Sequence, residues 1–130
     1  MEKKIIKTPN APDPIGPYSQ AVLFGDMLYM AGQIPVNPLT GSIEATDVAG
    51  ETQQVMQNLK AVLAEAGLDF SHVVKTTIFL SDMSLFSAVN EVYGGYFTTD
   101  FPARETVAVK GLPKNVNVEI SMIAHAPSLP

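Results

Sequence analysis

The chain has no cysteine and no tryptophan, only two histidines, and a single arginine among its eight basic residues. The absence of cysteine excludes disulfides, thiolate metal ligands and a cysteine nucleophile, and it is compatible with a cytoplasmic location. No apolar run approaches the roughly 20 residues of a membrane-spanning helix. The lysines near the N-terminus are not followed by the apolar segment of a secretory signal. We therefore expect a cytoplasmic protein with no membrane partner.

Positive charge is also scarce, because 13 acidic residues outnumber 8 basic ones and give a net charge of −5. A general nucleic-acid binder needs a basic surface that neutralises phosphates, so we expect no nucleic-acid partner. The 130 residues, 46% of them hydrophobic, are enough for one domain with a packed core but not for two. No repeat or linker divides them, and we expect a single domain over residues 1–130.

Hydrophobic periodicity predicts the element order β-β-β-α-β-α-β-β. Strands are expected within 3–7, 21–24, 27–30, 73–80, 103–109 and 116–126, and helices over 48–66 and from residue 82 or 84 to 96. A strand–helix–strand passage needs a crossover, so the sheet must be mixed, and both helices must cover one face to bury their apolar stripes. The fold class is therefore α+β. The uncovered face keeps apolar or small residues such as Ala108 and Ile123, which favours self-association.

Two charged residues stand out near the C-terminal end. Arg104 lies between a proline and a β-branched run, and Glu119 lies in a strand that is otherwise apolar or small. Alternation along the two strands leads us to expect both side chains on the sheet face away from the core. Arginine can hold a carboxylate with two parallel hydrogen bonds and keeps its charge. An ordinary solvated face is the other interpretation, and composition alone does not decide between them.

Three further positions have a structural and a functional interpretation. Tyr18 ends a proline-rich stretch, where it is either a packed loop aromatic or part of a pocket. Gly32 permits a turn, a bulge, or the close approach of a ligand to the backbone. Asn90 lies beside the apolar stripe of the second helix, and on its sequence position alone it is best interpreted as a surface residue.

Four segments together resemble the Rid family, the YjgF-like imine/enamine deaminases. They are IGPYSQ at 15–20, AGQIPVNP at 31–38, VNEVY at 89–93, and PAR with LPKNVNVEI within 102–120. The resemblance covers nearly the whole chain. It implies a fold similar to the Bacillus-type chorismate mutase, with the last strand inserted between earlier ones. It also implies a homotrimer whose active sites lie between neighbouring subunits.

The resemblance further implies an enzyme, a 2-iminobutanoate/2-iminopropanoate deaminase that limits metabolite damage. Its substrates would be 2-aminoacrylate, 2-aminocrotonate and their imine tautomers, and its functional link would be to the pyridoxal-phosphate dehydratases that release them. The products would be 2-oxoacids and ammonia. Arg104 and Glu119 are the implied catalytic residues: Arg104 would bind the substrate carboxylate and Glu119 would orient a water. The imine carbon is already electrophilic, so no cofactor, metal or covalent nucleophile is expected.

The same resemblance implies substrate-binding roles for four other residues. The Gly32 backbone would lie against the substrate, and Tyr18 and Asn90 would line or shape the pocket. Thr106 stands where the family often has cysteine and would still offer backbone hydrogen bonds. Ala31 stands where the family often has serine, so one possible substrate contact is missing and selectivity can differ.

Three other functions are alternatives to the deaminase. A non-catalytic trimeric protein that binds or senses a small carboxylate would need Arg104 but not Glu119. Ribonuclease activity, attributed to some relatives, is disfavoured by the acidic balance and the lack of a paired-histidine arrangement. Chorismate mutase chemistry rests only on fold analogy, which does not transmit function, and one arginine is little for a dianionic substrate.

Overall fold

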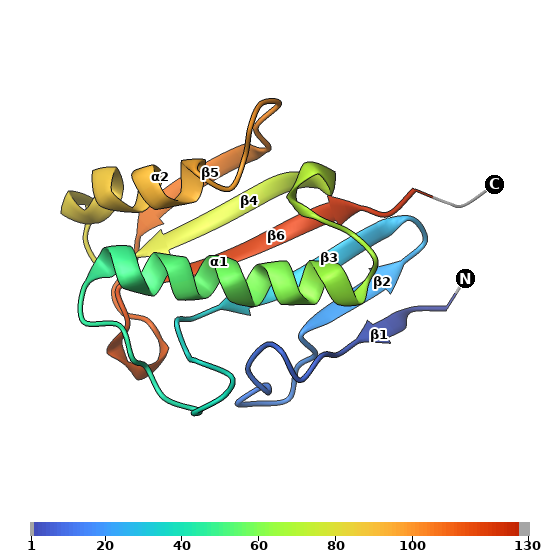
Figure 1. Ribbon diagram of the computed structural model, residues 1–130, viewed down its shortest axis with the longest axis horizontal. Coiled ribbons are helices and arrows are strands. Elements are labelled where there is room, and N and C mark those ends of the chain that lie inside the picture. Colours follow the sequence, from blue (N-terminus) through green and yellow to red (C-terminus); the bar gives the residue numbers. More distant parts are fainter. Residues whose placement is uncertain (1, 128–130) are drawn as a thin grey trace.

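The computed structural model describes residues 2–127, which form one α+β domain. Its elements follow the predicted order, with two helices laid over a single six-stranded sheet (Figure 1). The strands are β1 (Lys4–Ile6), β2 (Ala21–Phe24), β3 (Met27–Gln33), β4 (Val73–Leu80), β5 (Ala103–Ala108) and β6 (Val118–His125); the helices are α1 (Val48–Glu65) and α2 (Phe86–Gly94). The predicted single α+β domain is therefore confirmed for this part of the chain.

The sheet is mixed, as predicted, with the strand order β1-β2-β3-β6-β4-β5. Only β4 and β5 pair in parallel, while the other neighbours are antiparallel. In Figure 1 the last strand, β6, lies between β3 and β4 in the middle of the sheet. The expected insertion of the last strand between earlier ones is thus confirmed. β6 is anchored by hydrogen bonds on both sides, whereas β5 is an edge strand.

Helix α1 forms because its sequence supplies a cap, an apolar stripe and a stop. The Asp47 side chain accepts a hydrogen bond from the Gly50 N–H at 2.7 Å, which satisfies one of the free donors of the first turn. Gly67 follows the helix with φ of +76°, a left-handed conformation that glycine adopts without steric cost. The buried apolar residues of the stripe are Val55, Met56, Leu59, Val62 and Leu63.

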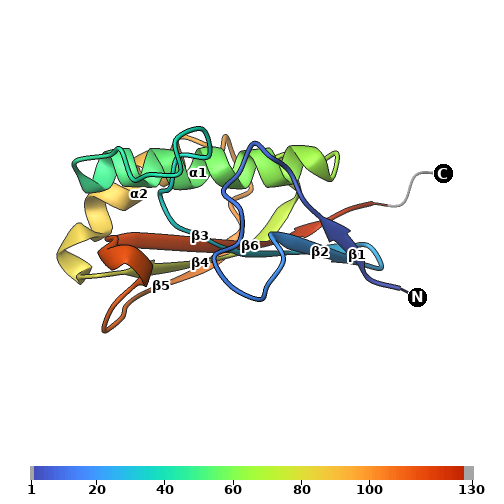
Figure 2. The ribbon, with the colours of Figure 1, turned by 90° about the horizontal axis from the view of Figure 1, so that it is seen from below.

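The core lies between the helices and the covered face of the sheet (Figure 2). On β6 the side chains that point into it alternate strictly with those that do not, as expected for a central strand. The completely or almost completely buried sheet residues are Ala21, Leu28, Thr76, Ile78, Leu80, Val118, Ile120, Met122 and Ala124. The expectation that both helices cover one face is confirmed.

The other face of the sheet carries no helix in Figure 2. The strand registers place several large apolar side chains on it, and they are between 43% and 49% exposed: Ile5, Phe24, Tyr29 and Val107. We call this set the uncovered apolar face. Exposed apolar surface of this kind often marks a protein interface. Within residues 2–127, no helix is long and apolar enough to span a membrane.

Candidate active site

Glu119 and Gly32 lie directly against each other on the uncovered side of the sheet. The register of β3 against β6 shifts between Met30 and Gln33, which marks a bulge in β3. A Cβ built on Gly32 would lie 2.9 Å from Glu119 Cδ and 3.1 Å from its Cγ, and closer still to Oε2. A side chain at position 32 would therefore displace the carboxyl group. Of the structures expected for Gly32, the bulge is present, and the group that lies against the glycine within the chain is the Glu119 side chain.

The carboxyl group of Glu119 lies in a partly dehydrated position. Burial raises its pKa above the ordinary value of 4.5. Among residues 2–127, no lysine, arginine or histidine forms an ion pair with it. A carboxylate with a raised pKa is a stronger base than an exposed one, and such groups are frequent at functional sites.

Tyr18 is held near Gly32 by the proline-rich loop that precedes β2. The loop is fixed by the buried side chain of Gln20, which accepts a hydrogen bond from the Thr8 N–H at 2.7 Å and donates to the carbonyl of Pro12 at 2.9 Å. The Tyr18 hydroxyl accepts from the Ile15 N–H at 3.1 Å. The loop is thus irregular but ordered, and it keeps the tyrosine ring at the rim of a cavity.

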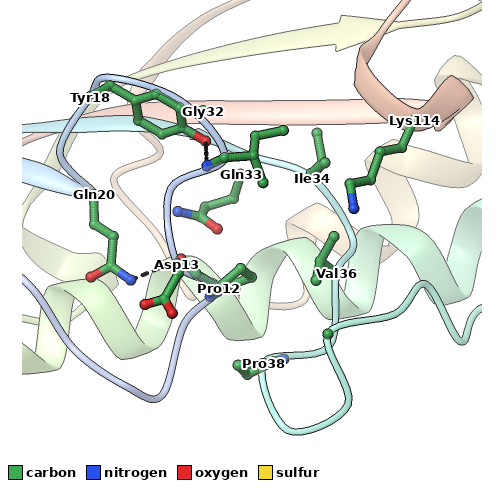
Figure 3. A pocket seen from close by; sticks show the side chains of 12 residues that line it. Pro12, Asp13, Tyr18, Gln20, Gly32, Gln33, Ile34, Val36, Pro38 and Lys114 are labelled. Atoms are coloured by element: carbon green, nitrogen blue, oxygen red, sulfur yellow. Dashed lines mark hydrogen bonds between the residues drawn. The ribbon is translucent and has the colours of Figure 1, made fainter.

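This cavity has a volume of about 250 Å³ and lies beyond the end of β3 (Figure 3). Tyr18 and Gly32 both line it, as the pocket role inferred for them requires. Across the cavity from Tyr18, Figure 3 shows Lys114 with its ammonium group reaching toward Ile34 and Val36. Neither Gln20 nor Lys114 was expected from the sequence to line the pocket. Gln20 lies in the IGPYSQ segment and Lys114 in the LPK segment that carried the resemblance.

The expectation for Arg104 was wrong in one respect: it does not share a face with Glu119. In the parallel pair β4–β5, Arg104 lies opposite Thr76, which is fully buried under the helices, and Glu119 lies opposite Phe79 on the other face. Neighbours directly opposite in a sheet share a face, so Arg104 is on the helix-covered side. Glu105, the next residue along β5, lies on the opposite face from Arg104 and pairs with Lys75 at 3.0 Å.

Aromatic rings of α2 explain how an arginine occupies the covered side. The Cζ atom of Arg104 lies 5.5 Å from the ring centre of Phe86 and 5.1 Å from that of Tyr93, within the range of cation–π attraction. Burial raises the pKa of the Tyr93 hydroxyl, which donates to Thr76 Oγ1 at 3.0 Å. Among the residues that the structure describes, no carboxylate forms an ion pair with Arg104. The guanidinium of Arg104 is therefore held against two aromatic rings and has no anionic partner among residues 2–127.

Asn90 and Thr106 belong to the same side of the molecule as Arg104. Asn90 is half-buried and lies four residues after Phe86 and three before Tyr93, so it shares their face of α2. Thr106 lies opposite Ile78 on the covered face, and its buried Oγ1 has no hydrogen-bond partner among residues 2–127. A buried hydroxyl without a partner is costly and requires an explanation. Because Asn90 is half-buried on the face of α2 that carries Phe86 and Tyr93, a place beside Arg104 fits it better than the surface-residue interpretation.

The candidate residues thus form two groups in one chain. Tyr18, Gly32 and Glu119 make up the Glu119 group; Asn90, Arg104 and Thr106 make up the Arg104 group. Arg104 and Glu119 lie on strands that are separated by β4, and their β4 partners are three residues apart. Their Cα atoms are therefore roughly 14 Å apart. Their side chains also leave opposite faces. One small carboxylic acid cannot contact both groups within a single chain. In the described part of the chain, no three His, Asp or Glu side chains come together to hold a metal ion.

Comparison with known proteins agrees with this fold. The chain belongs to the endoribonuclease L-PSP family, whose model matches residues 8–126. It is 50% identical to the Rid-family protein YyfA from Yersinia pestis, whose crystal structure superposes with a TM-score of 0.93 and covers 95% of this chain and 99% of that one. The resemblance to the Rid family is therefore confirmed.

Two relatives carry more specific descriptions. The human protein named 2-iminobutanoate/2-iminopropanoate deaminase is 44% identical over 122 residues, which are 94% of this chain and 89% of the human one. The crystal structure of Escherichia coli TdcF was solved with bound serine; TdcF is 42% identical, with a TM-score of 0.91 over 95% of this chain and 99% of its own.

Proposed function

We propose that this protein hydrolyses 2-imino acids and their enamine tautomers, such as 2-aminoacrylate and 2-aminocrotonate, to 2-oxoacids and ammonia. The observation that carries the proposal is the state of Arg104, a guanidinium fixed on two aromatic rings with no carboxylate partner among residues 2–127. Such a group is prepared to bind the carboxylate of a small acid. Two relatives support a substrate of this size: the human protein is named for 2-iminobutanoate and 2-iminopropanoate, and TdcF was solved with bound serine.

The chemistry requires a bound carboxylate, a placed water and a proton acceptor. Arg104 holds the carboxylate of the imine, and the water lies beside Glu119. The water oxygen bonds to C2 while one of its protons passes to the Glu119 carboxylate, and the imine nitrogen takes up a proton from solvent, which gives the carbinolamine. The carbinolamine then loses ammonia: the C–N bond breaks, Glu119 returns its proton to the leaving nitrogen, and the hydroxyl gives its proton to solvent as it becomes the carbonyl of the 2-oxoacid. Acid–base help of this kind contributes about 10²–10⁴-fold in rate.

The two groups of residues meet when two copies of the chain assemble. One copy supplies Arg104 from its edge strand β5, and its neighbour supplies the Glu119 group. The uncovered apolar face gives such copies a surface on which to associate, and a homotrimer closes the arrangement with three equivalent sites. An assembly mutant should therefore lose activity together with its oligomeric state. Light scattering of wild-type protein and of Tyr29→Glu, which places a charge on that face, tests this point.

A coupled assay tests the deaminase proposal. A serine or threonine dehydratase generates the imine, semicarbazide traps it, and added protein should lower the trapped fraction. Arg104→Ala should abolish this effect, and Arg104→Lys should restore only part of it because lysine lacks the planar fork. If Arg104→Ala were as active as the wild type, the assigned role of the guanidinium would be refuted.

Carboxylate binding without catalysis is the second candidate, favoured by the bound serine in the TdcF structure. In that case the protein would bind a small amino or oxo acid through Arg104, and Glu119→Gln would leave its affinity unchanged. The imine-trapping assay separates the two candidates, since a binder present at catalytic concentration would not change the trapped fraction.

A further inference from the structure

A buried carboxylate in the first turn of α1 lies close in space to the start of β6. Glu51 is only 7% exposed, and it accepts two hydrogen bonds from the same residue. The Asn117 backbone N–H donates to Oε1 at 2.8 Å, and the Asn117 side-chain amide donates to Oε2 at 2.8 Å. A carboxylate taken out of water is costly unless charge-assisted hydrogen bonds compensate it. The two bonds from Asn117 supply that compensation.

The remaining polar atoms of Asn117 are used by the end of β4. The Ser81 hydroxyl donates to Asn117 Oδ1 at 2.8 Å, and the Ser81 N–H donates to the Asn117 carbonyl at 3.0 Å. Each of the four polar atoms of Asn117 therefore has a partner. We call Glu51, Asn117 and Ser81 the β6 anchor. It joins a helix and two strands at one point and involves residues 66 positions apart in the chain.

The anchor lies next to Glu119. Asn117 immediately precedes β6 and is two residues before Glu119, while Ser81 is two residues after Phe79, the β4 partner of Glu119. On the other side, Gly32 leaves no space for a Cβ beside the carboxyl group. The backbone of Glu119 is thus fixed by the anchor, and its side chain is confined by β3. Little freedom remains for the carboxyl group.

We infer that Glu51 is a positioning residue, which acts through Asn117 to hold Glu119 where it must meet the water. The inference rests on the proposed hydrolysis, because it concerns the same carboxyl group. Glu51 touches no substrate. Its effect should therefore appear in turnover and not in substrate affinity, since the Arg104 group that binds the carboxylate is unchanged.

Paired substitutions test the anchor by exchanging its charge. In Glu51→Gln, the NH₂ group of the new Gln meets the NH₂ group of Asn117, so two hydrogen-bond donors face each other. In Asn117→Asp, the new carboxylate faces the carboxylate of Glu51. In the double variant, the Gln oxygen accepts from the backbone N–H of residue 117 and the Gln amide donates to the new Asp. That Asp still accepts from Ser81. The double variant thus restores every hydrogen bond with the carboxylate moved to the other side.

We expect each single variant to lower kcat on the order of ten- to hundredfold, as a displacement of about 1 Å at a reacting group does, with KM changed less than about threefold. The double variant should regain kcat to within about fivefold of the wild type. Leu59→Ala, a core substitution on the same helix, is the control: it lowers Tm but should keep the wild-type kcat of its folded fraction.

The possible outcomes distinguish the proposed hydrolysis from the positioning role of Glu51. An inactive wild-type protein would overturn the proposed function and this inference with it. An active wild type with single variants that lose only Tm, or a double variant no better than the singles, would overturn the inference alone. If the single variants do not fold, Ser81→Ala decides, because it removes one contact of the anchor; an unchanged kcat in that variant would also overturn the positioning role.

Discussion

Replacing Gly32 by alanine is the sharpest test of the Glu119 group. The added Cβ would lie 2.9 Å from Glu119 Cδ and 3.1 Å from Cγ, whereas unstrained carbon contacts lie at about 3.5–4.0 Å. The carboxyl group must therefore move by at least half an ångström, and rotation of the glutamate side chain makes a shift of about 1 Å the easiest response. A misplacement of that size costs on the order of 10²-fold in rate.

The same substitution should have little effect on stability. Gly32 does not have a left-handed φ, so alanine fits its backbone, and the clash falls on the end of a flexible side chain and not on the main chain. Replacement of glycine at a compatible position gains about 0.4–1 kcal/mol by restricting the unfolded chain, which offsets the cost of moving Glu119. We expect the Tm of Gly32→Ala to remain within a few degrees of the wild type.

The assay is the initial rate of imine hydrolysis at saturating substrate, measured beside Tm for wild type and variant. Gly111→Ala is the matched control, because a Cβ there meets nothing within 4 Å and its φ is also not left-handed. It should keep the wild-type kcat. A Gly32→Ala protein with wild-type kcat would show that the carboxyl group does not need its place over Gly32, and the assignment of Glu119 would fail.

Three further substitutions probe charge, polarity and packing. Glu119→Gln should lower kcat by about 10²–10⁴-fold with little change in KM. Burial raises the pKa of Glu119 in the folded state, so the wild type loses stability as the pH rises from the unfolded-state pKa of 4.5 through the folded-state pKa. Glu119→Gln should therefore have a higher Tm than the wild type at pH 7. A Tm difference that persisted below pH 4.5 would contradict this. Tyr93→Phe removes the hydroxyl bound to Thr76 and should lower the free energy of unfolding by about 1–3 kcal/mol, while kcat stays within about threefold because the ring under Arg104 remains. Leu59→Ala empties a fully buried site and should cost about 2–5 kcal/mol in denaturant unfolding, where a cost below 1 kcal/mol would mean that the core repacks.

Periodicity was sufficient where a strand or helix has one clearly apolar side. β6 is central, and the strict alternation of its buried residues predicted the face of Glu119 correctly. The apolar stripe of α1 was equally readable. Gly32 and Tyr18, two residues of the motif segments, line one cavity, and the shape of that cavity depends on loops whose paths the sequence does not specify.

The face of Arg104 could not be read in this way. β5 is an edge strand with no fully buried residue, so neither of its sides is marked as the core side. Polarity suggested the open face, but the rings of Phe86 and Tyr93 accept a cation on the covered one. The β6 anchor was missed for a different reason: no local pattern pairs a helix residue with one 66 positions later.

The central place of β6 also bears on how the molecule is made. Until residues 118–125 have been synthesised, β3 and β4 have no partner on their inner sides, and the nascent chain exposes two open strand edges. Such edges can pair with other chains, and the contacts that close them join distant parts of the sequence, which slows folding. Ribosome-bound chains halted before Val118 should therefore be sensitive to proteases and recruit chaperones, and only chains that include this strand should become compact.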